Sequence, residues 1–227
     1  MIDFLILYNP KKPYGDLNKT LVHNIVKIYG DEARVHVYGL KWDGGMVRNK
    51  MILQFIDTTQ FEHAVCLDSD CLVMKRLDVF DGSYFDVGVT VRKIKLWITC
   101  KRRPYHNYLN CGVIFFRRSG RPFFQRWTDI LDEWISKNVP VPGADQTSFN
   151  VAVLEGAFSL EGTKAYSEGL KPGVEIKKGG MTIKLFDSYK YNYGVFPVGR
   201  EQYIYHYKDE LNFDRTNDIM IGDNERL

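Results

Sequence analysis

The segment VCLDSDCLVM, residues 65–74, places Asp68 and Asp70 one residue apart inside a run that is otherwise almost wholly apolar. A carboxylate buried without a partner is costly, and two that lie side by side repel each other. In an extended segment, residues i and i+2 point to the same side, roughly 6–7 Å apart at Cα. Two carboxylates placed in this way can hold one hard divalent cation, which cancels their repulsion. The alternative is that Asp68 caps the next turn while Asp70 is solvated.

The segments that precede this motif predict an α/β fold. Two apolar, β-forming runs alternate with two stretches whose apolar residues recur at helical spacing. The predicted elements are a strand at 2–8, a helix capped by Asp16, a strand at 34–40, a helix from Met46 to about Thr58, and a strand with its turn at 61–74. This alternation indicates a mostly parallel sheet flanked by helices. Ligands of such sheets gather outside the carboxyl ends of the strands, where Asp68 is expected to lie.

The second half of the chain has a less regular pattern. The predicted elements are strands at 85–91 and 109–116, helices at 121–138 and 144–155, an irregular basic stretch at 93–109, a loop at 166–180 and a late strand at 204–208. The tail from about 211 to 227 is polar. Because the sequence shows no clear linker, we expect one domain over residues 1–227.

Composition excludes several classes of protein. Hydrophobic residues make up 44% of the chain, and 31 basic against 28 acidic residues leave a net charge of +3. That balance is not typical of a protein that binds nucleic acid. The cysteines lack C-x-x-C spacing, which favours free thiols in a reducing compartment. No segment reaches the length of a membrane span or has the pattern of a signal peptide, so we expect a cytoplasmic chain, which can be a module of a longer polypeptide.

Five short motifs, taken in order, resemble glycosyltransferases of the GT-A fold, and most nearly the glycogenin-like family 8. They are VCLDSDCLVMKRLDVF (65–80), LNCGVIFFRRS (109–119), ADQTSFN (144–150), YKYN (189–192) and YIYHYK (203–208). The resemblance implies a GT-A fold with a mostly parallel central sheet. It also implies metal-dependent transfer of a sugar from a UDP-sugar to a hydroxyl acceptor such as a glycan, with retention of configuration.

The resemblance also assigns roles to residues of this chain. Asp68, Asp70 and His206 would hold Mn²⁺, with Mg²⁺ as the alternative, and the cation would stabilise the charge that builds on the leaving diphosphate. Asp145 would contact donor hydroxyls, and Gln146 would stabilise the developing oxocarbenium ion. The residues that would bind the UDP-sugar are Tyr8, Asn9, Lys50, Ser69, Asn110, Gly112 and Lys208.

Several of these positions also have an interpretation without function. His206 and Tyr8 could be core residues, Asp145 could be an N-cap, and Asn110 with Gly112 could mark a strand start with a bulge. On the helix before the motif, Lys50 is the preferred donor contact, and Arg48 is not excluded. The family's His-x-x-Gly-x-x-Lys ending departs here to HYKDELN (206–212), so Lys208 would have to substitute for the missing lysine.

Other functions remain open at this point. A non-catalytic nucleotide-sugar-binding module would need the same residues, because sequence does not show turnover. A phosphatase of the haloacid-dehalogenase type also uses Asp-x-Asp, but Leu72 stands where that class needs Thr or Val. Sugar-1-phosphate nucleotidyltransferases need a glycine-rich loop after the first strand, which YNPKKPYGD (8–16) does not supply.

Overall fold

A computed structural model of the chain describes residues 1–8, 15–39, 48–82, 84–91, 109–138, 144–155, 170–192 and 201–206. The strands are β1 (Ile2–Tyr8), β2 (Ala33–Gly39), β3 (His63–Asp68), β4 (Cys71–Val73), β5 (Val87–Val91), β6 (Leu109–Phe116), β7 (Glu175–Lys178), β8 (Met181–Asp187) and β9 (Ile204–His206). The helices are α1 (Gly15–Tyr29), α2 (Arg48–Thr58), α3 (Arg121–Ser136), α4 (Ala144–Leu154) and the single turn α6 (Ser188–Tyr191). Short 3-10 turns lie at Gly30–Glu32 and Arg118–Gly120.

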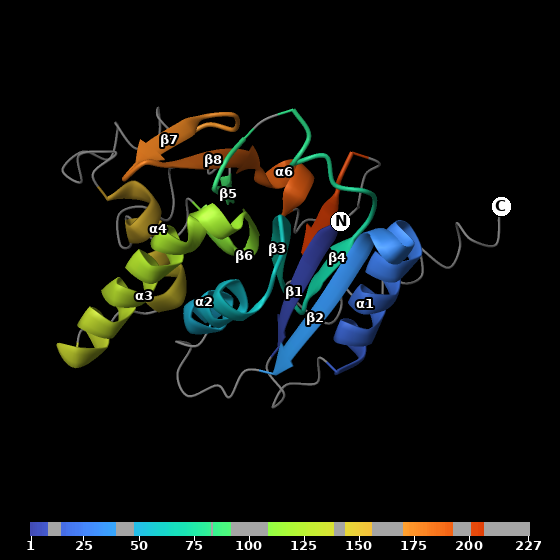
Figure 1. Cartoon of the computed structure of the whole chain (residues 1–227), viewed down its shortest axis with the longest axis horizontal. Helices are drawn as coiled ribbons and strands as arrows, with labels where there is room; N and C mark the ends of the chain where they lie inside the picture. Colours follow the sequence, from blue (N-terminus) through green and yellow to red (C-terminus); the bar gives the residue numbers. More distant parts are fainter. Residues whose placement is uncertain are drawn as a thin grey trace, which may run out of the picture.

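The described residues form a seven-stranded sheet in the order β2-β1-β3-β6-β5-β8-β7 and a separate pair, β4-β9. Within the larger sheet β1 is parallel to β2 and β3, and β5 is parallel to β8, whereas β6 and β7 run in the opposite direction. The predicted α/β class with a mostly parallel sheet is therefore confirmed. The carboxyl ends of β1, β2 and β3 meet at one edge, and the amino end of β6 joins them there (Figure 1).

Helices cover both faces of this sheet, which explains the uninterrupted apolar runs in its central strands. Leu5 and Leu7 belong to one core cluster with α2, α3 and α4, while Phe4 and Ile6 belong to a second cluster with α1, β4 and β9. Alternate residues of a strand face opposite sides, so β1 is buried from both. Figure 1 shows α1 on one side of the sheet and the other three long helices on the other side.

The predicted loop at 166–180 is wrong over residues 175–178, which form β7, and the hairpin partner β8 was missed as well. Gly179 and Gly180 join these two strands and have φ angles of 56° and 81°. Two central residues with positive φ are the signature of a tight hairpin turn, which the Gly-Gly pair permits. The charged residues Glu175 and Lys177 concealed the strand, because β7 lies at an exposed sheet edge.

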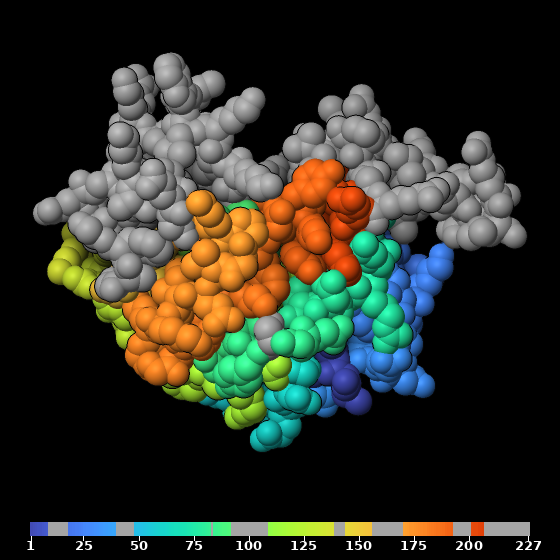
Figure 2. All heavy atoms as spheres, turned by 90° about the horizontal axis from the view of Figure 1, so that it is seen from above, coloured from blue at the N-terminus to red at the C-terminus, as the bar shows by residue number. Residues whose placement is uncertain are grey.

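The motif at 65–74 does not continue as one strand. After β3 the chain turns at Ser69 and Asp70, and β4 leaves the main sheet to pair antiparallel with β9. The late strand predicted at 204–208 is confirmed as β9, over residues 204–206. Figure 2 shows α6 and β9, orange to red, side by side and next to the green segment that includes β4.

Other predicted boundaries are met only in part. α1 begins at Gly15, one residue before the Asp16 predicted as its cap. Asn9, Met46, Lys208, most of the stretch at 93–109 and the polar tail from about 211 lie outside the described residues. No helix in the described part of the chain is long and apolar enough to cross a membrane.

Candidate active site

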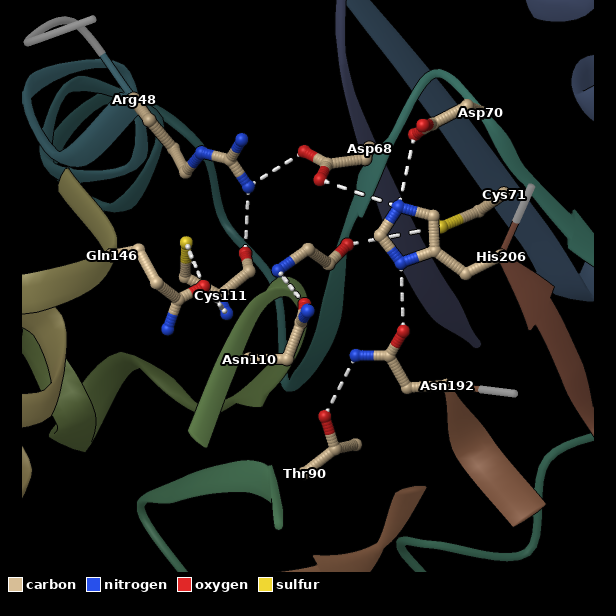
Figure 3. A network of polar contacts seen from close by, with 11 residues as sticks. Arg48, Asp68, Asp70, Cys71, Thr90, Asn110, Cys111, Gln146, Asn192 and His206 are labelled. Carbon is tan, nitrogen blue, oxygen red and sulfur yellow. Dashed lines mark hydrogen bonds and ion pairs between the residues drawn. The ribbon is translucent and has the colours of Figure 1, made fainter. Parts of the chain in front are cut away.

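Asp68, Asp70 and His206 lie together at the carboxyl edge of the sheet. Asp68 ends β3, Asp70 lies in the turn that follows, and His206 ends β9. His206 Nε2 is 3.1 Å from Asp70 Oδ1 and 3.7 Å from Asp68 Oδ2 (Figure 3). The three residues grouped from the sequence as metal ligands therefore converge in space, from positions 136 residues apart in the chain for Asp70 and His206.

Arg48, in the first turn of α2, neutralises the first aspartate. Its Nη1 lies 2.6 Å from Asp68 Oδ1 and donates to the carbonyl oxygen of Cys111 at 2.6 Å. Burial acts to lower the pKa of Arg48, but the charges of Asp68 and Asp145 raise that pKa well above its ordinary value. The guanidinium therefore stays charged inside the protein, and it reaches the site from the face opposite to His206 (Figure 3).

The two carboxylates have different electrostatic environments. Burial raises the pKa of Asp68 in spite of Arg48, and the negative charge of Asp70 adds to the rise. Burial acts to raise the pKa of Asp70 as well, but the hydrogen bond with His206 outweighs it and holds that pKa below its usual range. One carboxylate is thus paired with Arg48 and the other with His206, which is how the fold tolerates the pair.

The structure places Arg48 beside Asp68, and Lys50, the preferred donor contact on this helix, does not contact either aspartate; its predicted role stays a prediction. Lys50 is about half exposed and pairs with Asp132 on α3 at 2.8 Å. Residues two apart in a helix are separated by roughly 200° around its axis, so Arg48 and Lys50 face different sides. Only the placement of α2 on the sheet shows which of the two basic residues faces the aspartates.

A chain of hydrogen bonds fixes the orientation of His206. Asn192 Oδ1 lies 2.7 Å from His206 Nδ1, and Asn192 Nδ2 donates to Thr90 Oγ1 at 2.8 Å. In this orientation of the amide, Asn192 Oδ1 accepts a hydrogen bond from His206 Nδ1–H, and His206 Nε2 faces the carboxylates. Asn192 belongs to the YKYN motif, but its contact with His206 was missed because nothing in the sequence links the two side chains.

Gly112 supplies the space in which these groups meet. A Cβ atom there would lie 2.6 Å from both Asp68 Oδ2 and His206 Cε1, and 2.8 Å from Asn110 Oδ1. The Asn110 side chain accepts a hydrogen bond from the Gly112 backbone N–H at 2.6 Å. The pairing of β5 with β6 shifts its register here, so the strand start with a bulge is present as well.

Gln146 and Asp145 begin α4 beside β6, and their side chains differ in their contacts. Gln146 Oε1 accepts from the Cys111 N–H at 3.1 Å, and Gln146 Nε2 donates to the Leu109 carbonyl. The amide of Gln146 therefore holds α4 against β6. Among the described residues, none donates a hydrogen bond to the Asp145 carboxylate, which lies in the first turn of α4 rather than at its N-cap. The catalytic roles of both residues remain predictions.

The other predicted donor-binding residues are placed as follows. Tyr8 is partly buried at the end of β1, and its hydroxyl lies 3.2 Å from where a Cβ of Gly39 would be, so its ring lies over the end of β2. Ser69 is buried in the turn between the two aspartates. Asn9 and Lys208 are outside the described residues.

Sequence reasoning also missed Cys71 as a member of this group. A carboxylate oxygen of Asp70, the Cys71 sulfur and a ring nitrogen of His206 all lie within 4.8 Å of one another. The cysteine spacing predicts free thiols, and Cys71 is free and buried. Its place directly after Asp70 was the only signal in the sequence, and only the pairing of β4 with β9 brings it opposite His206.

The mostly parallel seven-stranded sheet with helices on both faces is a GT-A-like fold. No protein-family model matches the chain, and no protein of curated function has a similar sequence. Among solved structures, the crystal structure of a glycosyltransferase involved in the glycosylation of the major capsid of PBCV-1 is similar. Its TM-score is 0.59 at 17% identity, and the match covers 97% of this chain and 98% of that one. At this identity the likeness establishes the fold, so the predicted GT-A-like fold is confirmed; membership of family 8 remains a prediction.

We expect Gly112→Ala to destabilise the protein by about 1–3 kcal/mol, because the added methyl overpacks a buried, polar junction. Chemical denaturation measures this loss. Gly39→Ala is the matched control, since its methyl would meet only the far end of the Tyr8 side chain. A Gly112→Ala protein as stable as the parent would contradict the packing described for this site.

We expect Asn192→Ala to remove the hydrogen bond that holds a proton on His206 Nδ1. The buried Nδ1–H would lose its acceptor, at a cost of about 1–3 kcal/mol in stability. Nitrogen-15 NMR of the histidine ring reports which nitrogen carries the proton. Thr90→Val, which removes only the group that orients the amide, should have a smaller effect of the same sign. An unprotonated Nδ1 in the parent protein would refute this assignment.

Proposed function

We propose that the chain is a metal-dependent glycosyltransferase that moves a sugar from a UDP-sugar to a hydroxyl acceptor. The observation that carries the proposal is the convergence of Asp68, Asp70 and His206, with Arg48 beside them, at the ligand-binding edge of a GT-A-like sheet. The similarity to a glycosyltransferase of known structure supports the reaction class.

The donor set fits a divalent cation. Two carboxylates and one imidazole nitrogen suit Mn²⁺, with Mg²⁺ as the alternative, and Gly112 places no side chain of its own beside them. Asp68, Asp70 and His206 would hold the cation, which would act as a Lewis acid for the negative charge of a leaving diphosphate.

Arg48 is the residue of this chain that would act on the donor together with the aspartates. Its Nη1 already forms the ion pair with Asp68 and the hydrogen bond to the Cys111 carbonyl oxygen. Its buried Nε has no hydrogen-bond partner among the described residues. A fixed guanidinium at the edge of the cation site would donate to a diphosphate or to a sugar hydroxyl without reorganisation. It would also keep Asp68 ionised and available to the cation.

The donor would then extend along the carboxyl edge of the sheet. Leu7 is in register with Asp68, so Tyr8, the next residue and the last of β1, lies at the same edge of the sheet as the cation site. The Tyr8 ring would stack on the uracil ring. The charge of Asp145 raises the pKa of Arg48, and its carboxylate, which accepts no hydrogen bond from the described residues, would accept hydrogen bonds from the sugar hydroxyls. UDP-glucose and UDP-galactose are the first donors to test, and a glycan is the first acceptor.

Retention of configuration is also proposed on the resemblance to family 8. To stabilise the developing oxocarbenium ion directly, the Gln146 amide would have to release the β6 backbone. Otherwise Gln146 would act indirectly, by holding the β6 backbone in place. In the second case Gln146 is a positioning residue that sets the distance between α4 and the start of β6, where Asn110 and Gly112 lie.

A non-catalytic nucleotide-sugar-binding module is the second candidate, because the same residues would bind a donor without turning it over. Release of UDP from a bound UDP-sugar separates the two. The phosphatase alternative loses support, since Leu72 is fully buried in β4 opposite Tyr205.

We expect a UDP-hexose to raise the melting temperature of the protein only when Mn²⁺ is present. A ligand at 100 times its Kd stabilises the native state by about 2.7 kcal/mol, so the shift is measurable. Asp70→Asn should abolish the shift, and Asp132→Asn, an exposed carboxylate on α3, should retain it. If no UDP-sugar shifts the melting temperature with metal present, the proposed function fails.

We expect Arg48→Lys to weaken UDP-sugar binding by about tenfold or more, because hydrogen bonds to charged groups contribute roughly 1.5–3 kcal/mol. Lysine retains the charge opposite Asp68, so the variant avoids the cost of an unpaired buried carboxylate. Isothermal titration with Mn²⁺ present measures the change. Lys50→Met is the matched control on the same helix and should bind as the parent does; weaker binding in Lys50→Met alone would reverse the assignment.

A further inference from the structure

Cys71 is a ligand-type residue at the site that the proposed function leaves unused. Its sulfur lies within 4.8 Å of both an Asp70 carboxylate oxygen and a His206 ring nitrogen. The thiol donates a long hydrogen bond, of 3.8 Å, to the carbonyl oxygen of Gly112. Figure 3 shows the Cys71 sulfur next to the His206 ring, behind it in this view.

The fold holds these three ligand atoms together by backbone pairing. Cys71 and His206 are directly opposite each other in the antiparallel pair β4-β9, and such cross-strand side chains project from the same face. Asp70 precedes Cys71 and closes the turn after β3. Cys71 and His206 are buried, with 2% and 7% of their surface exposed, so neither is free to swing into solvent.

We propose that Cys71 is a ligand of the cation site, and that the site therefore binds Zn²⁺ through Asp70, Cys71 and His206 more tightly than it binds Mn²⁺ or Mg²⁺. The proposal rests on the proposed function only in using the same cation site. Zn²⁺ favours sulfur and nitrogen ligands in tetrahedral sites, whereas Mg²⁺ and Mn²⁺ favour carboxylate, carbonyl and water oxygens.

The geometry is within reach of tetrahedral coordination. Zn²⁺ binds sulfur at about 2.3 Å and nitrogen or oxygen at about 2.0–2.2 Å, so its ligand atoms lie roughly 3.3–3.6 Å apart. Since the three ligand atoms all lie within 4.8 Å of one another, no separation would need to contract by more than about 1.5 Å to reach these values. On binding, the thiol proton passes to solvent, and the cation offsets the repulsion between the thiolate and the two carboxylates.

This coordination has a consequence for glycosyl transfer. Asp68 Oδ2, 3.7 Å from His206 Nε2, is placed to supply a fourth ligand. Four protein ligands fill a tetrahedral Zn²⁺ site and leave no position for a diphosphate. Zn²⁺ would then displace Mn²⁺ and inhibit transfer, whereas Mn²⁺, bound through oxygen and nitrogen, would leave Cys71 protonated against Gly112.

The test uses Co²⁺ as a spectroscopic stand-in for Zn²⁺ on the full chain. A cobalt–thiolate bond gives a strong charge-transfer band in the near ultraviolet. We expect the parent protein to show this band on Co²⁺ addition, Cys71→Ser to lose it, and Zn²⁺ to displace it. Cys111→Ser is the matched control, since Cys111 is also buried at the site but its thiol donates to Gln146 Oε1. We expect Cys71→Ser to weaken Zn²⁺ binding at least tenfold and Mn²⁺ binding by less than twofold.

The outcomes separate this proposal from the proposed function. Co²⁺ binding without the band, or a band that persists in Cys71→Ser, overturns thiol ligation and leaves the glycosyltransferase proposal in place. A band that depends on Cys71, in a protein that binds no UDP-sugar, supports thiol ligation and overturns the function. Absence of any divalent binding overturns both. Cys71→Ala, which removes the ligand without adding a hydroxyl, should give the same spectrum as Cys71→Ser, and an unchanged melting temperature without metal shows that both variants fold.

Discussion

The interaction on which the rest of the site depends is the charge balance around Asp68 and Asp70. Two carboxylates in an apolar strand would be costly, and the fold brings one cationic or proton-donating partner to each. Arg48 reaches Asp68 from α2, and His206 reaches Asp70 from β9. The two partners approach from different faces of the sheet and meet the aspartates at its carboxyl edge, where α/β proteins bind ligands.

The position of His206 in turn depends on contacts around β4 and β9. Tyr191 and Tyr203 both donate to the carboxylate of Asp78, at 2.5 and 2.7 Å, and so tie α6 and the approach to β9 to the segment after β4. Asn192, directly after α6, contacts His206 through Nδ1, the ring nitrogen that faces away from the carboxylates. The small second sheet is therefore a support that carries one functional side chain to a site built on the large sheet.

Sequence patterns predicted the elements that are buried on both faces. The apolar runs of β1, β3 and β6, and the apolar face of α3 with Phe124, Trp127 and Leu131, were recognised because burial dictates their composition. Patterns failed where exposure or tertiary placement decides. Three of the four residues of β7 are charged, because β7 lies at a sheet edge. The choice between Arg48 and Lys50 depends on how α2 packs on the sheet. The contacts of Asn192 and Cys71 with His206 depend on the tertiary fold and are not visible in the local sequence. Cys71 and His206, for example, are paired across more than 130 residues.

The central claim is that Asp68, Asp70 and His206 form one cation site for a nucleotide diphosphate. The most direct measurement is a crystal structure of the protein with Mn²⁺ and UDP, with anomalous scattering used to locate the manganese. The account predicts one manganese bonded to His206 Nε2 and to both aspartates, with the diphosphate within hydrogen-bonding distance of Arg48 and the uracil against Tyr8. Manganese or UDP bound elsewhere, with the contact between His206 and Asp70 intact, would contradict it.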